Sequence, residues 1–310
     1  MGSELVKSIA GIPATRVIAA TRCAGQHHFP DDVTQACVGE LGPDTAWHAP
    51  LQGVHTLIHT AARVHVMHDT AADPLALFRE VNTAGTLNLA RQAAQAGVRR
   101  FIFISSIKVN GESTGRDEAF RPDDPAHPSD PYAISKHEAE LALLALAGTC
   151  AMEVVIIRPV LVYGPGVKAN FLQLMRLVRQ GIPLPLGAID NARSLVSLDN
   201  LVDFIRVCID HPGAANQIFL VSDGHDLSTT GLIRGLKAHM PSSGWLIPVP
   251  QRVIEFGARL LGRNAAAQRV LGSLRVDISK NRDLLHWAPP VSVDEGLRKT
   301  VDHFLASDQK

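Results

Sequence analysis

The chain has 310 residues, 46% of them hydrophobic and 19% charged, which is enough to bury the core of one large domain or two modest ones. Its 30 Lys and Arg residues balance 30 Asp and Glu residues, so its overall charge gives no basis for binding nucleic acid or an anionic membrane. The four cysteines lie far apart without a C-x-x-C pair, and no apolar run approaches the roughly 20 residues of a membrane span. We therefore expect a cytoplasmic protein with reduced thiols.

The predicted elements alternate between strand and helix along the first half of the chain. In chain order we expect a short helix, three strands, a helix, a strand, a helix and a strand, at residues 3–10, 16–21, 36–38, 54–59, 74–96, 101–104, 132–146 and 154–157. Most of these strands are short, nearly continuous apolar runs, which is typical of strands buried on both faces. Strands of this kind separated by helices predict an α/β fold with a Rossmann-like, doubly wound parallel sheet.

The pattern changes after Pro159, where Gly-Pro and Pro-Leu-Pro turns interrupt it and mostly helical segments then run to the C-terminus. We expect an NAD(P)-binding domain over residues 1–160. A smaller, mostly helical substrate-binding lobe is expected over residues 161–310, with segments around 193–222 packing back on the first domain.

Three side chains between residues 100 and 140 could form an acid/base relay. Ser106 follows a predicted strand, and Tyr132 and Lys136 lie one turn apart on a predicted helix. An ammonium group near a phenol lowers the phenol's pKa from about 10, so we expect Lys136 to lower the pKa of Tyr132. A bare Y-x-x-x-K is also common on the surface of helix starts. Its placement after Ser105-Ser106, within a strand–helix alternation, favours catalysis.

Further motifs accompany these residues in order and at fitting spacings. From Val54 onward the chain therefore resembles the extended short-chain dehydrogenases/reductases, specifically the NAD-dependent epimerase/dehydratase family of nucleotide-sugar enzymes. The motifs are His59-Thr60-Ala61-Ala62, Asn82-Thr83-Ala84-Gly85-Thr86, Ser105-Ser106, Tyr132 with Lys136, Arg158-Pro159, Val162-Tyr163-Gly164-Pro165-Gly166, and Arg193 with Asp199-Asn200.

The resemblance implies a role for each matching residue. Ser106 and Tyr132 would be the catalytic pair, and Lys136 would act with them and also bind the nicotinamide ribose. The residues implied to line the cofactor are Gly2, Arg22, Glu40, Leu41, Thr60, Ala61, Ala62, Asn82, Tyr132, Lys136, Pro159 and Val160.

The nucleotide-sugar substrate would be bound by Ser106 and, at its uridine and diphosphate, by Asn170, Phe171 and Arg193. A guanidinium suits a diphosphate, although a charge on an exposed loop is the alternative for Arg193. A second arginine of the family has two candidates here, Arg269 and Arg275. Trp287 with Pro289-Pro290 resembles a C-terminal packing segment of the family.

One departure from the family bears on the reaction. Its 4,6-dehydratases carry Thr-Asp-Glu after the catalytic strand, because elimination needs an extra acid and base, whereas this chain has Ser106-Ile107-Lys108. A dehydratase is therefore not expected. We expect a UDP-sugar 4-epimerase of polysaccharide synthesis, with two alternatives: a 4-keto-6-deoxy nucleotide-sugar reductase, or a dinucleotide-binding sensor.

The cofactor is expected to be NAD for an epimerase and NADP for a reductase. Arg22 stands where the family has an acidic residue that binds the adenosine 2′-hydroxyl, and it favours a 2′-phosphate unless it is simply solvated. Glu40-Leu41 matches a pair that flanks adenine in the family.

The N-terminus resembles the family's glycine-rich, pyrophosphate-binding turn only from its third glycine, here Gly2. Two explanations stay open: the start codon is assigned too late, which we favour, or the chain is truncated. On this resemblance we expect the sheet of the chain as given to lack the family's first strand. If the truncation is real, we expect weak cofactor binding and low stability, because that strand would be central.

Beyond substrate and cofactor, few partners are expected. The family suggests a homodimer through the helices at 74–96 and 132–146. No metal is expected, although two sets of residues have ligand-like spacing: His65, His68 and Asp69, and His27-His28 with Asp31 and Asp32.

Overall fold

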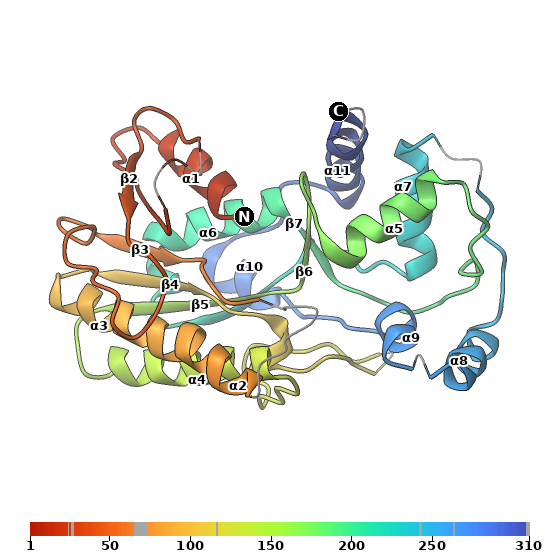
Figure 1. Cartoon of the computed structure of the whole chain (residues 1–310), viewed down its shortest axis with the longest axis horizontal. Helices are drawn as coiled ribbons and strands as arrows, with labels where there is room; N and C mark the ends of the chain where they lie inside the picture. Colours follow the sequence, from red (N-terminus) through yellow and green to blue (C-terminus); the bar gives the residue numbers. More distant parts are fainter. Residues whose placement is uncertain are drawn as a thin grey trace.

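Four parallel strands form the centre of the structure in the order β3-β4-β5-β8 (Figure 1). The structure is a computed structural model that describes residues 1–23, 25, 28–64, 73–115, 117–241, 244–262 and 264–307. The four strands span Thr56–His59 (β3), Arg100–Ile104 (β4), Glu153–Pro159 (β5) and Ile218–Val221 (β8). Phe103 of β4 lies opposite His59 of β3 and Ile156 of β5. All of β4 is buried, as expected for a strand with a neighbour on each side and helices on both faces.

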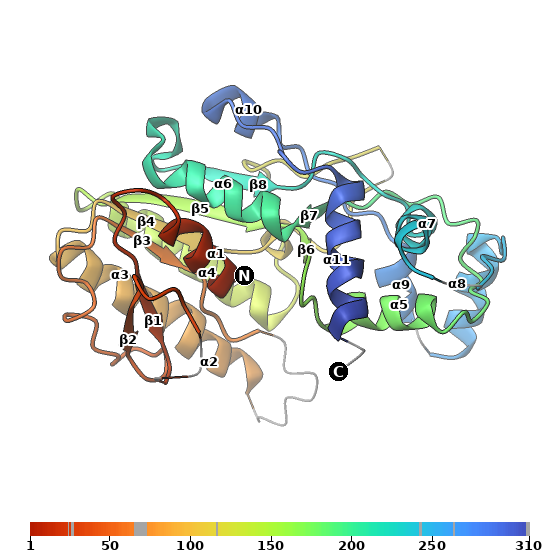
Figure 2. The same cartoon turned by 90° about the horizontal axis from the view of Figure 1, so that it is seen from above.

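Helices cover both faces of this sheet (Figures 1 and 2). One face carries α2 (Pro74–Phe78), the π-helical turn η1 (Arg79–Gly85), α3 (Thr86–Gln95) and α4 (Pro131–Ala147). The other face carries α1 (Gly2–Ala10) and α6 (Leu198–Asp210). Phe101 and Phe103 belong to the apolar cluster of the first face, and Ile102 and Ile104 to that of the second, because successive strand residues point to opposite sides. The predicted doubly wound α/β fold is confirmed.

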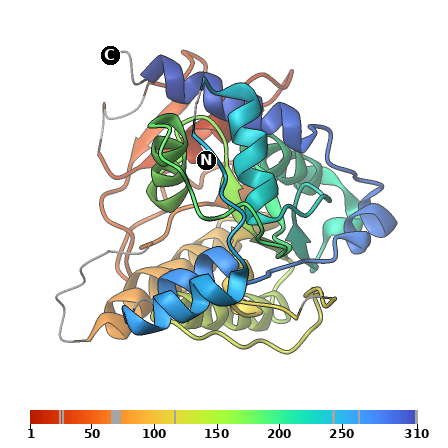
Figure 3. The same ribbon diagram turned by 90° about the vertical axis from the view of Figure 1, so that its right-hand side faces the viewer.

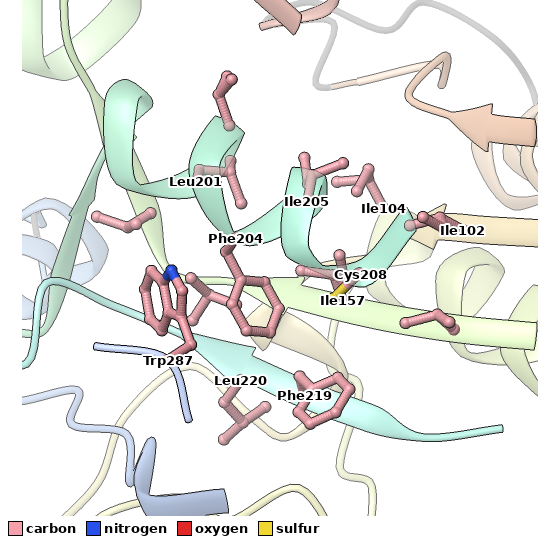
Figure 4. Packing of buried hydrophobic residues seen from close by; sticks show 14 of the residues in the cluster. Ile102, Ile104, Ile157, Leu201, Phe204, Ile205, Cys208, Phe219, Leu220 and Trp287 are labelled. Carbon is pink, nitrogen blue, oxygen red and sulfur yellow. The ribbon is translucent and has the colours of Figure 1, made fainter. Parts of the chain in front are cut away.

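Helix α6 packs on the sheet through large aromatic contacts (Figure 4). The ring centroid of Phe204 lies 4.8 Å from that of Trp287 and 5.5 Å from that of Phe219 in β8. The indole Nε1 of Trp287 also donates a 2.8 Å hydrogen bond to Asp203. The packing role predicted for Trp287 is confirmed, since its side chain is buried against α6.

Strands β1 (Ile18–Thr21) and β2 (Thr34–Cys37) form a separate two-stranded parallel sheet. Among the described residues, β1 is paired only with β2, and β3 is paired only with β4. Each of these two strands therefore has one edge whose backbone groups make no strand pairing.

A second group of elements lies at one end of the sheet, on the right in Figure 1 and nearest the viewer in Figure 3. Strands β6 (Leu161–Tyr163) and β7 (Leu195–Ser197) pair in parallel. Helices α5 (Ala169–Arg179), α7 (Thr229–His239) and α11 (Val293–Ser307) share a third apolar cluster with Tyr163. The remaining helices are α8 (Gln251–Leu260), α9 (Asn264–Leu271), α10 (Ser279–Leu285) and the short turns η2 (Ile107–Val109) and η3 (Pro212–Ala214). In the described ranges, no helix is both long and apolar enough to cross a membrane.

Candidate active site

The carboxyl end of β4 positions the candidate hydroxyl. The strand ends at Ile104, and half-buried Ser106 follows two residues later in extended conformation. Its Oγ accepts a 3.3 Å hydrogen bond from the backbone N–H of Lys108 and so caps the turn η2. Ser106 therefore lies at the edge of the sheet where ligands of parallel α/β folds bind.

The start of α4 positions the phenol and the amine. Asp130 caps this helix, because its carboxylate accepts a 2.7 Å hydrogen bond from the N–H of Ala133, and Pro131 occupies the first turn, where it needs no partner for a backbone N–H. Tyr132 consequently lies in the first turn and Lys136 one turn further along the same face. The second oxygen of Asp130 accepts a 2.5 Å hydrogen bond from the ammonium of Lys108, so the cap also connects α4 to the loop after β4.

Lys136 is joined directly to the strand that carries the hydroxyl. Its side chain is 2% exposed, and its Nζ donates a 2.8 Å hydrogen bond to the carbonyl of Ile104. Nζ also lies 4.4 Å from the centre of the Phe103 ring. Burial lowers the pKa of Lys136 to about 7, against a smaller opposing effect of Glu140. The structure thus places Lys136 beside the end of β4.

The predicted lowering of the Tyr132 pKa is wrong for this structure. The pKa of Tyr132 is raised to about 12, first because the phenol is buried and second because the Asp130 carboxylate disfavours a phenolate. The ammonium of Lys136 donates a hydrogen bond to the Ile104 carbonyl. The ring of Tyr132 packs edge-on against Phe78, with centroids 6.2 Å apart.

A buried ion pair stabilises α4 one turn after Lys136. Arg158 donates to both carboxylate oxygens of Glu140, at 3.0 and 2.6 Å, and to the side-chain oxygen of Asn110 at 2.9 Å. The side chains of Arg158 and Glu140 are 5% and 2% exposed. Burial alone would raise the pKa of Glu140, but His137, 3.9 Å away, and Arg158 lower it. Glu140 lies one turn after Lys136, and the sequence indicates only its partner, through the Arg158-Pro159 motif.

The π-helical turn η1 places Asn82 in the interior. The predicted helix over residues 74–96 is present, but residues 79–85 wind as a π-helix, in which each N–H reaches one residue further back. Asn82 is 1% exposed; its amide nitrogen donates to the hydroxyl of Ser135 at 3.0 Å and to the carbonyl of Arg63 at 3.1 Å. Its amide oxygen accepts from the backbone N–H of Arg63 at 2.8 Å. Asn82 therefore fixes the segment after β3 against α4.

His59 ends β3 as a neutral, fully enclosed imidazole. Its Nε2 lies 2.9 Å from Thr86 Oγ1, and its ring stacks on Phe103 with centroids 5.8 Å apart. Burial, and then the nearby Lys136 charge, lowers the pKa of His59 to about 3. The sequence pointed to His59 only as part of a motif and gave no sign of this burial.

The residues predicted to bind the cofactor gather at the carboxyl ends of the strands. Thr60 directly follows β3, and a Cβ added to Gly2 would lie 3.3 Å from its Oγ1, so the N-terminus of α1 closely approaches this strand end. Helix N-termini at such edges bind phosphate groups. Ala61 and Ala62 continue the same segment, buried Pro159 ends β5, and buried Val160 directly follows it. This arrangement fits a dinucleotide.

The predicted adenine-side residues also lie together. Arg22 and Glu40, both exposed, follow β1 and β2 and approach to 3.6 Å. Leu41 lies against η1: a Cβ on Gly85 would be 3.1 Å from the Leu41 Cγ and 3.2 Å from the nitrogen of Gly42. The pairing of Arg22 with an acidic neighbour reduces the charge available for a 2′-phosphate.

The predicted substrate residues have different environments. Asn170 is exposed in the first turn of α5, whereas Phe171 is 4% exposed and stacks on Tyr163 with centroids 5.7 Å apart. Arg193 donates to the carbonyls of Arg269 and Gly272, at 3.1 and 2.9 Å, and burial lowers its pKa.

Of the two further candidate arginines, Arg275 donates to Asp226 at 2.7 Å. Arg269 is exposed at the end of α9, next to Arg193. The histidines and aspartate at positions 65, 68 and 69, and His27, lie outside the described residues.

Comparisons with known proteins agree with this geometry. Residues 1–222 match the family described as the NAD dependent epimerase/dehydratase family. The whole chain is 50% identical to 94% of a UDP-glucose 4-epimerase from Vibrio cholerae. Over 92% of its length it is 28% identical to 87% of the N-acetyl-alpha-D-glucosaminyl-diphospho-ditrans,octacis-undecaprenol 4-epimerase of Escherichia coli O157:H7. Its fold matches a structure of UDP-glucose 4-epimerase with UDP-glucose from Thermotoga maritima at a TM-score of 0.76, with 19% identity, covering 99% of this chain and 96% of that one.

Proposed function

Because the chain belongs to the NAD-dependent epimerase/dehydratase family, we propose that it is an NAD-dependent enzyme that epimerises a UDP-sugar at C4. The observation that carries this proposal is the 50% identity to a UDP-glucose 4-epimerase along the whole chain. The position of Ser106 just after β4 and the hydrogen bond from Lys136 to the Ile104 carbonyl support the proposal, because ligands of doubly wound folds bind at the carboxyl ends of the strands.

We assign the catalytic roles to Ser106, Tyr132 and Lys136. The chemistry supplied by bound NAD would be hydride transfer at C4 of the sugar, with hydride removed from one face and returned to the opposite face. Tyr132 would take the proton of the C4 hydroxyl and later give it back, while Ser106 donates a hydrogen bond to the same oxygen. The pKa of about 12 means that free Tyr132 holds its proton. Lys136, whose pKa is about 7, would supply a positive charge that favours proton removal.

The binding residues are proposed in two sets. The cofactor would be bound by Gly2, Arg22, Glu40, Leu41, Thr60, Ala61, Ala62, Asn82, Tyr132, Lys136, Pro159 and Val160, and the substrate by Ser106, Asn170, Phe171 and Arg193. Their clustering at the carboxyl ends of the strands supports the first set. Phe171 would act through its place at the start of α5, because its ring is packed in the interior.

The side chain at position 108 favours an epimerase over a dehydratase. Lys108 stands where a 4,6-dehydratase of the family has glutamate, and its ammonium is paired with Asp130 at 2.5 Å. A lysine already paired with a carboxylate cannot replace that glutamate. Epimerisation requires only the transfer of one proton and one hydride, and both return to the same sugar.

One experiment separates the candidate reactions. The protein is incubated with UDP-glucose, UDP-N-acetylglucosamine and a 4-keto-6-deoxy nucleotide sugar, with and without NADPH, and the sugars are analysed by chromatography. We expect C4 epimers to form without added reductant. Stoichiometric NADPH oxidation would instead indicate a reductase, and bound cofactor without turnover of any sugar would indicate a sensor. The lipid-diphosphate sugar named for the E. coli relative is assayed in parallel.

Three further features are proposals. A division near residue 160 is supported by the separate apolar cluster around Tyr163. A homodimer through α2, α3 and α4 is supported by Leu141 of α4, whose side chain is 55% exposed. A cytoplasmic location is supported by the four unpaired cysteines.

A further inference from the structure

Exposed apolar side chains concentrate in one short stretch of the second group of elements. Among the described residues, half of the fourteen large apolar side chains that are exposed lie between residues 245 and 270, which identifies a surface that the proposed chemistry does not use. They are Trp245, Ile247, Val253, Phe256, Leu260, Leu261 and Val270. Trp245, Leu260 and Leu261 are exposed by 78%, 72% and 75%. Large apolar surface of this kind marks an interaction site.

Helix α8 arranges part of this apolar surface as a single stripe. Val253, Phe256 and Leu260 are three and four residues apart, so they form one stripe along the helix. Phe256 is 64% exposed, and none of the ten residues of α8 is buried. Figure 1 shows α8 at the far end of the molecule, with α9 beside it. We call the exposed stripe of Val253, Phe256 and Leu260 the α8 stripe.

Positive charge borders the α8 stripe. Arg252 and Arg259 are exposed on α8, one helical turn or less from the apolar residues. Residues 244–272 contain four arginines and one glutamate, a net charge of +3 in a chain whose overall charge is +0. This segment is therefore positively charged although the charges of the whole chain cancel.

We propose that the α8 stripe docks on an anionic lipid surface. An apolar stripe beside exposed arginines is the pattern of a helix that lies in the membrane interface, where the arginine stems extend towards the headgroups. A second copy of this chain fits less well, because a twofold contact would bring the arginines of both copies close together. Charge complementarity thus selects the anionic lipid.

The docking surface is connected to the proposed substrate site. Arg193 donates hydrogen bonds to the carbonyls of Arg269 and Gly272, at the end of α9. α8 contacts α9, so lipid docking would orient the Arg193 side of the site towards the membrane. The docking itself does not depend on which sugar the enzyme converts.

The test uses the full chain and vesicles. Flotation is measured with phosphatidylcholine vesicles and with vesicles that also contain phosphatidylglycerol. Trp245 adds a spectroscopic signal, because the other two tryptophans, Trp47 and Trp287, are 7% and 5% exposed. We expect binding to the anionic vesicles only, with a blue shift of the Trp245 emission and weakening at high salt.

Variants locate the contact. Phe256→Glu with Leu260→Glu should abolish flotation, and each of Arg252→Gln and Arg259→Gln should weaken binding about fivefold. Leu284→Glu is the matched control, since Leu284 is 41% exposed on α10, and it should bind as the unaltered chain does. Circular dichroism and turnover of UDP-sugar in solution should be unchanged in all of them, because these residues lie outside the proposed site.

Three outcomes would overturn the proposal. The first is the absence of binding to anionic vesicles, and the second is equal binding by the double glutamate variant. The third is sedimentation equilibrium showing a dimer that the double glutamate variant loses, without vesicle binding, which would assign the stripe to a second copy.

Discussion

The ammonium of Lys136 donates a 2.8 Å hydrogen bond to the carbonyl of Ile104, the last residue of β4. This bond joins the helix that carries Tyr132 to the strand that leads to Ser106. The relay therefore depends on the packing of α4 against β4. The effect of these residues on turnover and their effect on folding stability can be tested separately.

Tyr132→Phe should lower kcat by about 10²-fold or more, because it removes the proposed proton carrier and keeps the ring that packs against Phe78. The measurement is epimer formation under saturating UDP-sugar, beside the melting temperature. Phe78→Leu is the control, since it alters the packing and leaves the phenol in place. Full turnover by Tyr132→Phe would exclude Tyr132 as the acid/base group.

Lys136 should make stability depend on pH above neutrality. Its pKa is about 7 in the folded chain and ordinarily 10.5, so the unfolded chain binds more protons between these values. The free energy of unfolding contributed by this group should therefore rise with pH across this window, by up to about 1.4 kcal/mol per pH unit. Urea denaturation at pH 7, 8.5 and 9.5 measures it, and Lys136→Met should flatten the rise. An equal increase in the free energy of unfolding with pH in the unaltered chain and in Lys136→Met would contradict the prediction.

His59 should destabilise the fold in acid. Its folded pKa is about 3 against an ordinary 6.5, so the unfolded chain takes up a proton here as the pH falls below 6.5. This contribution to the free energy of unfolding is fully present above pH 6.5 and decreases towards pH 3. His59→Gln should show a shallower loss of stability between pH 6.5 and 4 in the same denaturation experiment. An unchanged acid slope would show that His59 protonates without unfolding.

Glu140→Ala should cost about 3–5 kcal/mol of stability, because it leaves the guanidinium of Arg158 buried without its carboxylate. The double variant Glu140→Leu with Arg158→Met removes both charges and should recover most of the loss. Chemical denaturation of both variants gives the comparison. If the single variant is as stable as the unaltered chain, water or another group must compensate the charge.

Arg269→Ala should raise KM for a UDP-sugar about tenfold with little change in kcat, as expected for the loss of one charged hydrogen bond to a diphosphate. Arg269 is the candidate because its backbone carbonyl accepts a hydrogen bond from Arg193. Arg275→Ala is the comparison, and it should affect stability more than KM because Arg275 is paired with Asp226. The opposite ranking of the two KM values would assign the diphosphate to Arg275.

The sequence predicted the features that depend on local pattern. Short apolar runs separated by helices indicated the parallel sheet, and the strand end before Ser106 placed the relay, because parallel strands end at a common edge. Features set by tertiary packing were not predictable in this way. The π-helical turn around Asn82 follows from contacts with α4. The raised pKa of Tyr132 follows from burial and from Asp130.

The separate pairing of β1 with β2 and of β3 with β4 has a consequence for behaviour in concentrated solution. Along one edge of β1 and of β3, the described residues make no strand pairing. Such edges can add a strand from another molecule through backbone hydrogen bonds. Aggregation of this protein through such edges should therefore accelerate with concentration.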